Sequence, residues 1–574
     1  MSFKSRSRRR LRVFRTKPCG SICSPGQRQI PSDRIPVTPI PKFSISEVHL
    51  PYVQANMILR RFASSVASFK LPPTICQLLA GPTLPEPPTI TVSGWIKSIR
   101  RQKNVAFAVV SDGSSATGLQ AVFTGNGEGI KGLTNGAAVR LTGKLVPSPG
   151  AGQEKELLVD LGKPGEASEG KAKGNLQVLG SCDPEAYPIQ KQALSTEYLR
   201  DHSHLRARTD HIASMIRLRD ALKRNIGTFF DEQGFCYTHT PVLTGNDAEG
   251  AGEAFKIAPI SSEHPAAHAS SAVPQLSTSS PSTSSHPHRP AHDVEFFSRP
   301  AYLTVSHQLH LESLATALSR VYTLSPCFRA EPSLTKRHLA EFWMLEAEWA
   351  FGSENNSIED VCALVEAGLR QVVGGIVASP DTHMLWKGGD EAKHRALVDA
   401  VAPSTKPWTR ISYTDAVKAL ETALPFAGFE YEPGWGAQLQ SEHERWIAET
   451  FVGGPVFITD YPAALKPFYM RLNDSPTTDA KATVACFDLI IPHVGELAGG
   501  SVREERLPML EARMREGLGG DLDAYRWYAD LRRFGGAPHA GFGMGFERLV
   551  GWVGGMENVR ECVPFPRWAG RMLL

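Results

Sequence analysis

One segment, residues 327–348, combines the residue types that recognise a nucleotide. It reads Cys-Phe-Arg-Ala-Glu-Pro-Ser-Leu-Thr-Lys-Arg-His-Leu-Ala-Glu-Phe-Trp-Met-Leu-Glu-Ala-Glu, which predicts two strands joined by a polar loop, with alternate residues on one face. An arginine can donate two hydrogen bonds to a phosphate, a glutamate can accept one from an amino group, and a phenylalanine can stack on a base. The candidate ligands are Arg329, Glu331, Arg337, His338 and Phe342. Taken alone, the segment would be better explained as a hairpin with surface ion pairs.

Two later segments add groups that a bound nucleotide needs. Asp488 and Glu496 flank an apolar run, and their hard oxygen atoms suit Mg²⁺ that bridges substrate phosphates. Residues 541–548, Gly-Phe-Gly-Met-Gly-Phe-Glu-Arg, predict a strand-to-helix junction where the backbone approaches a ligand and Arg548 opens the helix. The chain has no Gly-x-x-x-x-Gly-Lys-Ser/Thr, and the glycine run departs from the dinucleotide fingerprint. A P-loop protein and a Rossmann dehydrogenase are therefore excluded.

The elements that precede these segments predict a separate small domain over residues 71–161. Alternating residues and Gly/Ser/Asn turns indicate five short strands, at residues 89–99, 105–110, 119–123, 138–146 and 156–161. Such a series is consistent with an OB-fold barrel. Arg100, Arg101 and Phe107 would suit single-stranded nucleic acid, although a structural barrel with a surface phenylalanine explains them equally well.

The rest of the body predicts an α+β domain. Residues 162–194 have the composition of a linker or hinge, and apolar residues at helical spacing predict a helical stretch over 195–233. Strands and helices then alternate up to residue 574. Residues 261–290 interrupt them with ten serines, five prolines and no aromatic residue, a composition that cannot build a core and is expected to be disordered.

Length and composition exclude several classes of protein. A chain of 574 residues suggests about three domains at roughly 100–200 residues each. No apolar run approaches the roughly 20 residues that cross a bilayer. The nine cysteines are scattered, which argues against a zinc site or a disulfide framework and for a reducing compartment.

The first 70 residues differ from the body, because they contain 14 Lys/Arg against two acidic residues, while the whole chain carries only +3. A solvated tail or a nucleic-acid-binding arm would explain residues 1–20. Residues 57–70 are basic, rich in serine and amphipathic, like a mitochondrial presequence, with four apolar residues on one helical face: Leu59, Phe62, Val66 and Phe69. We expect 1–70 to be a targeting segment that directs the protein to the mitochondrial matrix, with a cytoplasmic form if Met57 is a second start.

Several blocks, in a consistent order, resemble class II aminoacyl-tRNA synthetases. Residues 327–348, 541–549 and 558–567 resemble motifs 2 and 3, and residues 195–241 resemble motif 1. The similarity extends over about 88–574 apart from the insert, within the aspartyl, asparaginyl and lysyl group, and is closest to the asparaginyl enzymes. It implies an OB-fold anticodon-binding barrel, a catalytic domain built on an antiparallel sheet flanked by helices, and a homodimer formed through motif 1.

The resemblance also implies a reaction, in which an amino acid attacks the α-phosphate of ATP and the acyl group then passes to tRNA. Such chemistry needs positioning and charge neutralisation more than a nucleophile. The implied catalytic residues are Arg329 at the α-phosphate and Arg548 at the γ-phosphate. The remaining implied roles are adenine binding by Glu331 and Phe342, γ-phosphate binding by His338, ATP binding by Arg337, Mg²⁺ binding by Asp488 and Glu496, and anticodon binding by Arg100, Phe107 and Gln120.

Amino-acid choice is implied by the block Ser-His-Gln-Leu-His-Leu-Glu at 306–312. Aspartyl enzymes place a lysine where this chain has Leu311, and Glu312 follows it. Removing a cation and offering an acceptor favours a neutral amide over a carboxylate. The implied amino-acid ligands are Glu249 in a closing loop, Gln308, Glu312 and Arg503, so the expected partners are asparagine and tRNA(Asn).

Three alternatives remain open at this stage. An aspartyl-tRNA synthetase that charges both tRNAs would share the fold, but Leu311 argues against it. A non-catalytic tRNA-binding paralogue would have no reason to keep all five of the implied ATP and metal ligands: Arg329, Glu331, Asp488, Glu496 and Arg548. A tRNA-independent asparagine synthetase would not need the barrel.

Overall fold

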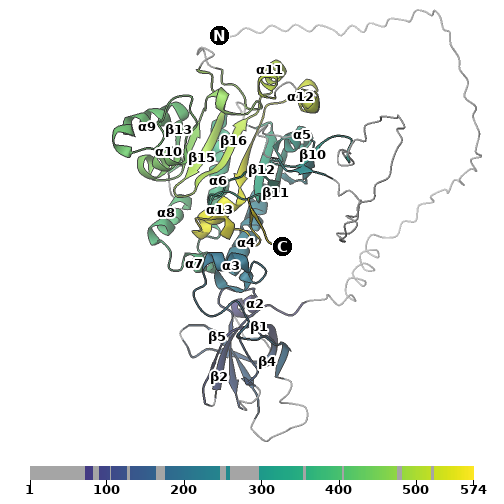
Figure 1. Ribbon diagram of the computed structural model, residues 1–574, viewed down its shortest axis with the longest axis vertical. Coiled ribbons are helices and arrows are strands. Elements are labelled where there is room, and N and C mark those ends of the chain that lie inside the picture. Colours follow the sequence, from purple (N-terminus) through teal and green to yellow (C-terminus); the bar gives the residue numbers. More distant parts are fainter. Residues whose placement is uncertain are drawn as a thin grey trace, which may run out of the picture. The chain divides into compact units, whose positions relative to one another are not determined.

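The computed structural model describes residues 71–81, 89–103, 105–125, 130–150, 152–162, 175–245, 254–258, 296–352, 357–403, 406–474, 481–518 and 522–574 (Figure 1). The predicted targeting segment 1–70 and the insert 261–290 lie outside the described residues. Among the helices that are described, none is both long enough and apolar enough to cross a membrane.

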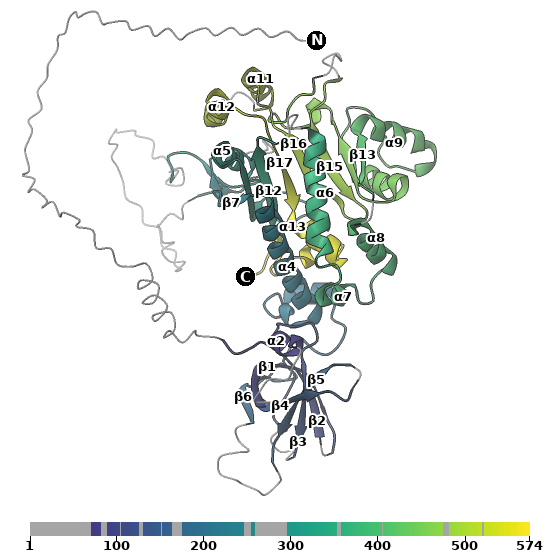
Figure 2. The same cartoon turned by 180° about the vertical axis from the view of Figure 1, so that it is seen from behind.

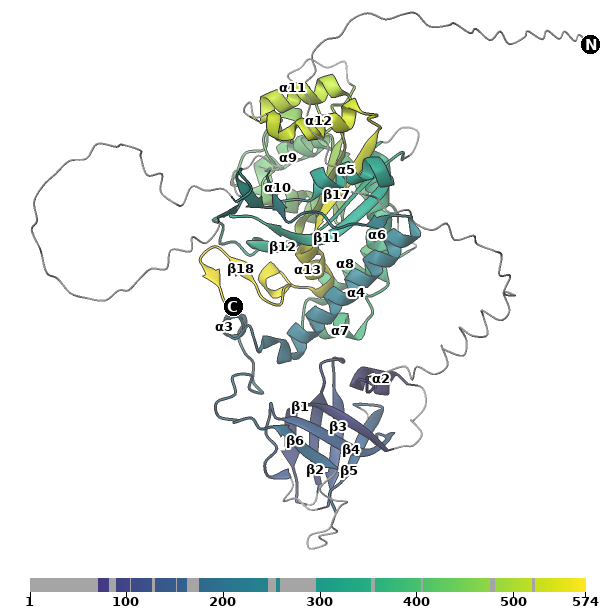
Figure 3. The ribbon, with the colours of Figure 1, turned by 90° about the vertical axis from the view of Figure 1, so that its right-hand side faces the viewer.

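The five-stranded OB-fold barrel is confirmed. Its strands are β1 (Thr89–Arg101), β2 (Val105–Ser111), β3 (Leu119–Thr124), β4 (Ala138–Pro147) and β5 (Lys155–Asp160), and pairing of β1 with β4 closes it (Figure 3). Alternate residues of β4 point inward, as in Val139, Leu141 and Leu145, which are fully buried. A Cβ atom at Gly143 would lie 2.2 Å from the carbonyl oxygen of Leu158, so this position needs a glycine.

The segment 162–194 contributes more than a connection to this barrel. Its strand β6 (Leu176–Gly180) pairs with β4 as a sixth strand, and helix α2 (Ile75–Ala80) packs its Ile75 into the barrel core. Most side chains of β6 are exposed, which explains why its residues read as a linker in the sequence.

An eight-stranded sheet forms the centre of the second domain. Its order is β13-β14-β15-β16-β17-β12-β11-β7, antiparallel in the middle and parallel only at its two end pairs. The strands are β7 (Cys236–Tyr237), β11 (Arg320–Phe328), β12 (Glu341–Ala350), β13 (Thr409–Ser412), β14 (Val456–Thr459), β15 (Cys486–Ile491), β16 (Gly495–Val502) and β17 (His539–Gly545). Two small sheets lie beside it, made of β8 (Leu243–Thr244), β9 (Lys256–Ile257) and β10 (Ala301–Leu303), and of β18 (Arg567–Trp568) and β19 (Arg571–Met572).

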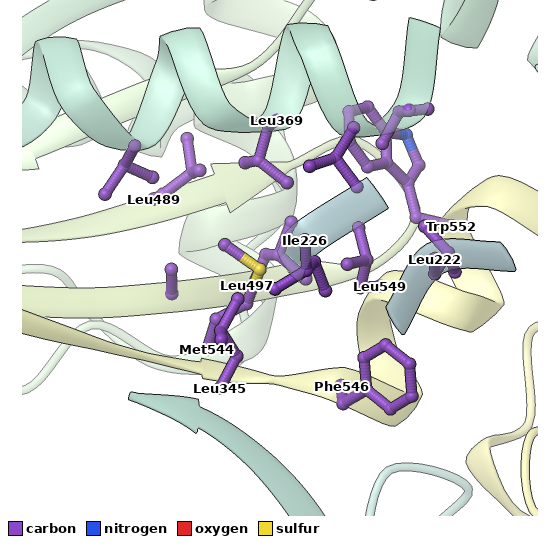
Figure 4. Close-up of a cluster of buried hydrophobic side chains, with 14 of the residues drawn as sticks. Leu222, Ile226, Leu345, Leu369, Leu489, Leu497, Met544, Phe546, Leu549 and Trp552 are labelled. Atoms are coloured by element: carbon purple, nitrogen blue, oxygen red, sulfur yellow. The ribbon is translucent and has the colours of Figure 1, made fainter. Parts of the chain in front are cut away.

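Three helices cover one face of the sheet (Figure 2): α4 (Asp210–Glu232), α6 (Ile358–Gly374) and α13 (Phe546–Gly554). Their apolar sides meet the sheet in the main core, where Ile226, Leu369 and Leu549 pack against Leu345, Leu497 and Met544 (Figure 4). The predicted helical stretch 195–233 is interrupted. A short helix α3 (Thr196–Asp201) and a 3-10 turn precede α4, which begins where the side chain of Thr209 accepts a hydrogen bond from the amide of Ile212.

The remaining helices pack around the other strands. They are α5 (Gln308–Leu318), α7 (Pro380–Trp386), α8 (Glu391–Val401), α9 (Tyr413–Ala427), α10 (Ser441–Arg445), α11 (Leu507–Gly517) and α12 (Arg526–Arg533). Helices α11 and α12 pack against each other (Figure 3). A second core cluster, which includes Val305, Tyr413 and Tyr528, joins α9 and α12 to the end of the sheet.

Candidate active site

The predicted nucleotide ligands line one cavity of about 160 Å³ over strands β12, β16 and β17. The cavity contains every one of Arg329, Glu331, Arg337, His338, Phe342, Glu496 and Arg548. These residues come from segments up to 219 positions apart in the chain, Arg329 to Arg548. Their convergence argues against the alternative of an ordinary hairpin with surface ion pairs.

Arg329 and Glu331 lie just beyond a strand. Their predicted place on the strand is wrong, because β11 ends at Phe328 and Pro332 has no amide hydrogen to donate to a continued ladder. Arg329 nevertheless lies over the ring of Phe342, with its guanidinium carbon 5.4 Å from the ring centroid. The carboxylate of Glu331 lies 3.2 Å from Nε2 of His338 and 3.9 Å from Arg329.

Two further arginines face this cavity from other elements. Arg548, in the first turn of α13, donates a hydrogen bond of 2.5 Å to the carbonyl oxygen of Glu496. Arg337 donates to the hydroxyl of Ser441 at 3.1 Å. The same helix α10 contributes Glu444, which sequence reasoning missed. Burial and the carboxylates of Glu496 and Asp488 raise the pKa of Glu444 to about 7.

The predicted metal ligands Asp488 and Glu496 lie on adjacent strands. A Cβ atom at Gly499 would lie 3.3 Å from Oδ1 of Asp488 and 3.4 Å from Oε1 of Glu496, so the two carboxylates converge on one glycine. Hard oxygen ligands of this kind fit a divalent cation. Asp488 is already engaged, however. Lys466 donates to both of its oxygen atoms, at 2.8 and 2.7 Å.

The glycines of β17 make room for buried carboxylates. Gly541, Gly543 and Gly545 pair with Glu348, Glu346 and Met344 of β12. A Cβ atom at Gly541 would lie 2.1 Å from the carboxylate of Glu348. The sequence had suggested that these glycines let a ligand approach, and the structure shows that one of them accommodates a protein carboxylate.

A second polar cluster is centred on Glu312, which is fully buried. Its Oε2 atom lies 2.6 Å from the hydroxyl of Tyr528, 2.8 Å from Arg532 and 3.0 Å from Nε2 of His539. Gln308 donates to Oε1 at 3.0 Å. Although burial opposes ionisation, Arg532, His539 and Arg503 hold the pKa of Glu312 well below its usual range.

Arg503 completes this cluster. It forms a bidentate ion pair with Glu348, donates to Ser501 at 2.7 Å and lies 3.9 Å from Glu312. Burial raises the pKa of Glu348 above its usual range, and the Glu312 carboxylate adds to the effect against the pull of Arg503. The structure therefore brings Gln308, Glu312 and Arg503 together, whereas Glu249 lies outside the described residues.

Sequence reasoning missed several partners in this cluster. Glu346 accepts from the hydroxyl of Ser306 at 2.5 Å and the amide of His307 at 2.8 Å, and the other missed residues are Glu348, Tyr528, Arg532 and His539. The signal for Glu346 and Glu348 was present, because acidic residues alternate along a strand that the glycine run accompanies. No local signal links Tyr528 or Arg532 to Glu312, more than 200 positions away.

The predicted anticodon residues share the outer face of the barrel. Arg100 pairs with Phe107 across β1 and β2, with its guanidinium carbon 5.7 Å from the ring centroid. Gln120 lies on the neighbouring strand β3, opposite Val109, and donates to Glu156 at 3.2 Å. An arginine, an aromatic ring and an amide on one barrel face suit single-stranded nucleic acid.

Comparisons with known proteins show the family of both domains. Residues 195–569 match the family described as tRNA synthetases class II (D, K and N), and residues 90–160 match the OB-fold nucleic acid binding domain. The chain is 41% identical to the asparagine–tRNA ligase of Thermosynechococcus vestitus over 490 residues, 84% of this chain and 96% of the relative. It is 43% identical to that of Rhodopirellula baltica over 493 residues, 85% of this chain and 91% of the relative.

Solved structures give the same result. The asparaginyl-tRNA synthetase of Pyrococcus horikoshii, complexed with asparaginyl-adenylate, superposes with a TM-score of 0.68 at 26% identity, covering 88% of this chain and 100% of the other. That of Entamoeba histolytica, also with asparaginyl-adenylate, has a TM-score of 0.65 at 25% identity, covering 86% and 97%. The chain therefore belongs to the asparagine–tRNA ligases among the class II tRNA synthetases.

Proposed function

We propose that the protein activates asparagine with ATP and transfers the asparaginyl group to tRNA(Asn). The observation that carries this proposal is the buried Glu312, which has Gln308 and Arg503 near its Oε1 atom and Arg532 at its Oε2 atom. The adenylate seen in two structural relatives supports the same chemistry.

ATP would bind in the cavity over β12, β16 and β17. Arg329 would hold the α-phosphate and stabilise the negative charge that builds up as the asparagine carboxylate attacks. Phe342, which lies under Arg329, would stack on adenine, and Glu331 would accept a hydrogen bond from the adenine amino group. His338, Arg337 and Arg548 would bind the outer phosphates. We also propose that Asp488 and Glu496 would hold Mg²⁺, the divalent cation whose charge would offset that of the phosphates.

Asparagine is preferred over aspartate because the acceptor and donor pattern of the pocket matches an amide. Arg503 would donate to the side-chain oxygen, and Oε1 of Glu312 would accept from the amide nitrogen. A bound aspartate would place a carboxylate against the ionised Glu312, leaving both groups without a proton to share. Leu311 supplies no cation to compensate for this repulsion.

The test is amino-acid-dependent exchange between ATP and pyrophosphate, with asparagine and aspartate compared on the same preparation. We expect exchange with asparagine and at least ~100-fold less with aspartate, the discrimination available to a site that rejects an isostere through unmatched polar groups. Exchange with aspartate alone would favour the aspartyl alternative. Exchange with neither amino acid would favour the non-catalytic alternative.

We further propose that the enzyme is a homodimer. Strand β7 is the edge of the eight-stranded sheet, and its Tyr237 is 45% exposed. Leu243 follows and is 48% exposed. A second copy packed along this edge would cover apolar side chains and an unpaired strand. Sedimentation equilibrium should give twice the chain mass, and Tyr237→Glu should shift the protein towards the monomer.

Finally, we propose that residues 1–70 direct the protein to the mitochondrial matrix. The support is the basic, amphipathic pattern of residues 57–70. Fusion of residues 1–70 to a fluorescent reporter should lead to import into isolated mitochondria. Replacing Arg60 and Arg61 by glutamate should abolish import, and failure of the unmodified fusion to enter the mitochondria would contradict the proposal.

A further inference from the structure

The loop between β11 and β12, residues 329–340, carries two of the proposed phosphate ligands, Arg337 and His338. Thr335 contacts both of them. Its Oγ1 atom lies 2.6 Å from Nδ1 of His338 and accepts a hydrogen bond of 3.4 Å from the amide of Arg337. The positions of these two ligands therefore depend on where Thr335 is held.

Arg560 holds Thr335 from a distant part of the chain. Its Nη2 atom donates to the carbonyl oxygen of Thr335 at 3.2 Å and to that of Leu334 at 3.1 Å. The amide of the preceding residue, Val559, donates to the carbonyl oxygen of Lys336 at 3.0 Å. Three consecutive carbonyl groups of the loop thus accept hydrogen bonds from two neighbouring residues.

Arg560 is itself fixed in place. It is 9% exposed, and its guanidinium carbon lies 4.4 Å from the ring centroid of Trp568. The side chain of Asn558 accepts a hydrogen bond of 3.1 Å from the amide of Arg560. Because both its backbone and its guanidinium are held, this arginine can restrict the movement of the loop.

The same segment also reaches the adenine end of the cavity. Val559 and Val563 form an apolar cluster with Leu339, and Phe342 packs against that cluster. Val559 lines the cavity, whereas Arg560 does not. Residues 558–563 therefore support the nucleotide ligands, and Arg560 acts on the loop without lining the cavity.

We propose that Arg560 is a positioning residue for ATP, because it holds the loop that directs Arg337 and His338 at the outer phosphates. This inference rests on the proposed ATP site. A planar guanidinium carries its N–H groups in fixed directions and can donate to two neighbouring carbonyl groups at once, which a flexible ammonium does less well.

The test compares Arg560→Met and Arg560→Lys with the wild-type protein. Both variants should raise the KM for ATP in pyrophosphate exchange, and the Kd for a non-hydrolysable ATP analogue, by about 10-fold or more. The KM for asparagine should be unchanged, because the cluster around Glu312 is built from other segments. Arg560→Lys keeps the charge, so wild-type behaviour of this variant would show that charge alone matters and would overturn the inference.

Two further measurements separate positioning from a general loss of structure. Hydrogen exchange at the amides of residues 333–338, followed by mass spectrometry without ATP, should be faster in both variants. In a double-mutant cycle, Arg560→Met combined with His338→Ala should raise the Kd for the analogue by less than the product of the two single effects, because Arg560 acts partly through His338. A full product would overturn the inference.

Arg571→Met is the matched control, because Arg571 lies over the same ring of Trp568, at 5.5 Å, and pairs with Asp201 of α3. It should leave the Kd, the KM values and the loop exchange unchanged.

The remaining outcomes each decide one question. If Arg560→Met does not fold, Arg560→Lys decides alone. An unchanged Kd in a variant that melts normally would overturn the inference, even if its loop exchanged faster. If the wild-type protein shows no asparagine-dependent exchange, although it binds the analogue and the variants bind it more weakly, only the proposed function is overturned.

Discussion

The carboxylate of Glu312 lies 2.8 Å from the guanidinium of Arg532, and both side chains are almost completely enclosed by protein. Arg532 comes from α12 and Glu312 from α5, so this ion pair joins the two helices. It also keeps Glu312 ionised, since Arg532 is the largest favourable influence on its pKa. In the proposed function, an ionised acceptor beside Arg503 would recognise an amide and repel a carboxylate.

Replacement of Glu312 by glutamine should therefore change amino-acid choice. The variant leaves Arg532 without its carboxylate partner and Arg503 with Glu348 alone, so the site attracts the negative side chain of aspartate more strongly. We expect kcat/KM for asparagine to fall by ~100-fold or more and the preference for asparagine over aspartate to shrink. Stability should fall by about 3–5 kcal/mol, as expected when one partner of a buried ion pair is removed.

Glu366→Gln is the control for this experiment. Glu366 is a buried carboxylate that pairs with Arg370 at 2.9 Å and Arg410 at 3.2 Å, away from the pocket. Its loss should lower the melting temperature without changing the ratio of asparagine to aspartate activation. If both variants changed that ratio equally, Glu312 would have no direct part in specificity.

Arg329→Ala should abolish amino-acid activation while leaving tRNA binding nearly intact. In its proposed role the guanidinium stabilises charge as the α-phosphate is attacked, so kcat for pyrophosphate exchange should fall by at least ~100-fold. Gel-shift measurements with tRNA should give an unchanged Kd, because the barrel is untouched. Arg370→Ala, at a partly buried site on α6, controls for loss of a structural arginine. Survival of adenylate formation in Arg329→Ala would show that the α-phosphate lies elsewhere.

The elements that were predicted correctly depend on patterns that lie within short stretches of the sequence. Alternation within β1 to β5 and the run of glycines in β17 are visible in a few consecutive residues, so the barrel strands and the strand-to-helix junction could be predicted. The strand β6 was missed because its side chains are mostly exposed. The position of Arg329 was predicted incorrectly because strand periodicity does not reveal where a ladder stops.

The contacts that the sequence did not predict join residues that lie far apart in the chain. Lys466 and Asp488 are 22 positions apart, and their charges carry no pattern that would identify them as partners. Tyr528 reaches Glu312 only because α12 packs beside α5 in the folded domain. Such contacts depend on the packing of whole helices, which one sequence does not encode at any fixed spacing.

His310 should make the protein more sensitive to acid. Burial, together with the neighbouring His307, lowers the pKa of His310, and its ring stacks on Trp527 at 5.8 Å. Below pH 6.5 the unfolded chain binds this proton more readily than the folded chain, so stability is lost as pH falls. His310→Asn should make the free energy of unfolding depend less steeply on pH, by up to about 1.4 kcal/mol per pH unit.

Thermal melts of the protein between pH 5 and pH 7.5 would measure this effect. His204→Asn is a suitable control because His204 is exposed on the surface, and it should leave the pH dependence unchanged. If the stability of the wild-type protein and of His310→Asn depended on pH equally steeply, the assigned role of His310 would be contradicted.

Phe107→Ala should separate tRNA recognition from activation. The ring lies on the outer face of the barrel beside Arg100, where an anticodon base would stack on it. Loss of one base–aromatic stack costs about 1–3 kcal/mol, so Kd for tRNA(Asn) should rise by about 5- to 150-fold. Asparagine-dependent pyrophosphate exchange without tRNA should be unchanged, because Phe107 lies in the barrel and contributes nothing to the ATP cavity.

Tyr431→Ala, which removes an exposed aromatic ring from the catalytic domain, should leave the Kd for tRNA unaltered. An unchanged Kd for Phe107→Ala would mean that this barrel face does not bind the anticodon, whereas a parallel loss of exchange would show that the substitution had damaged the fold.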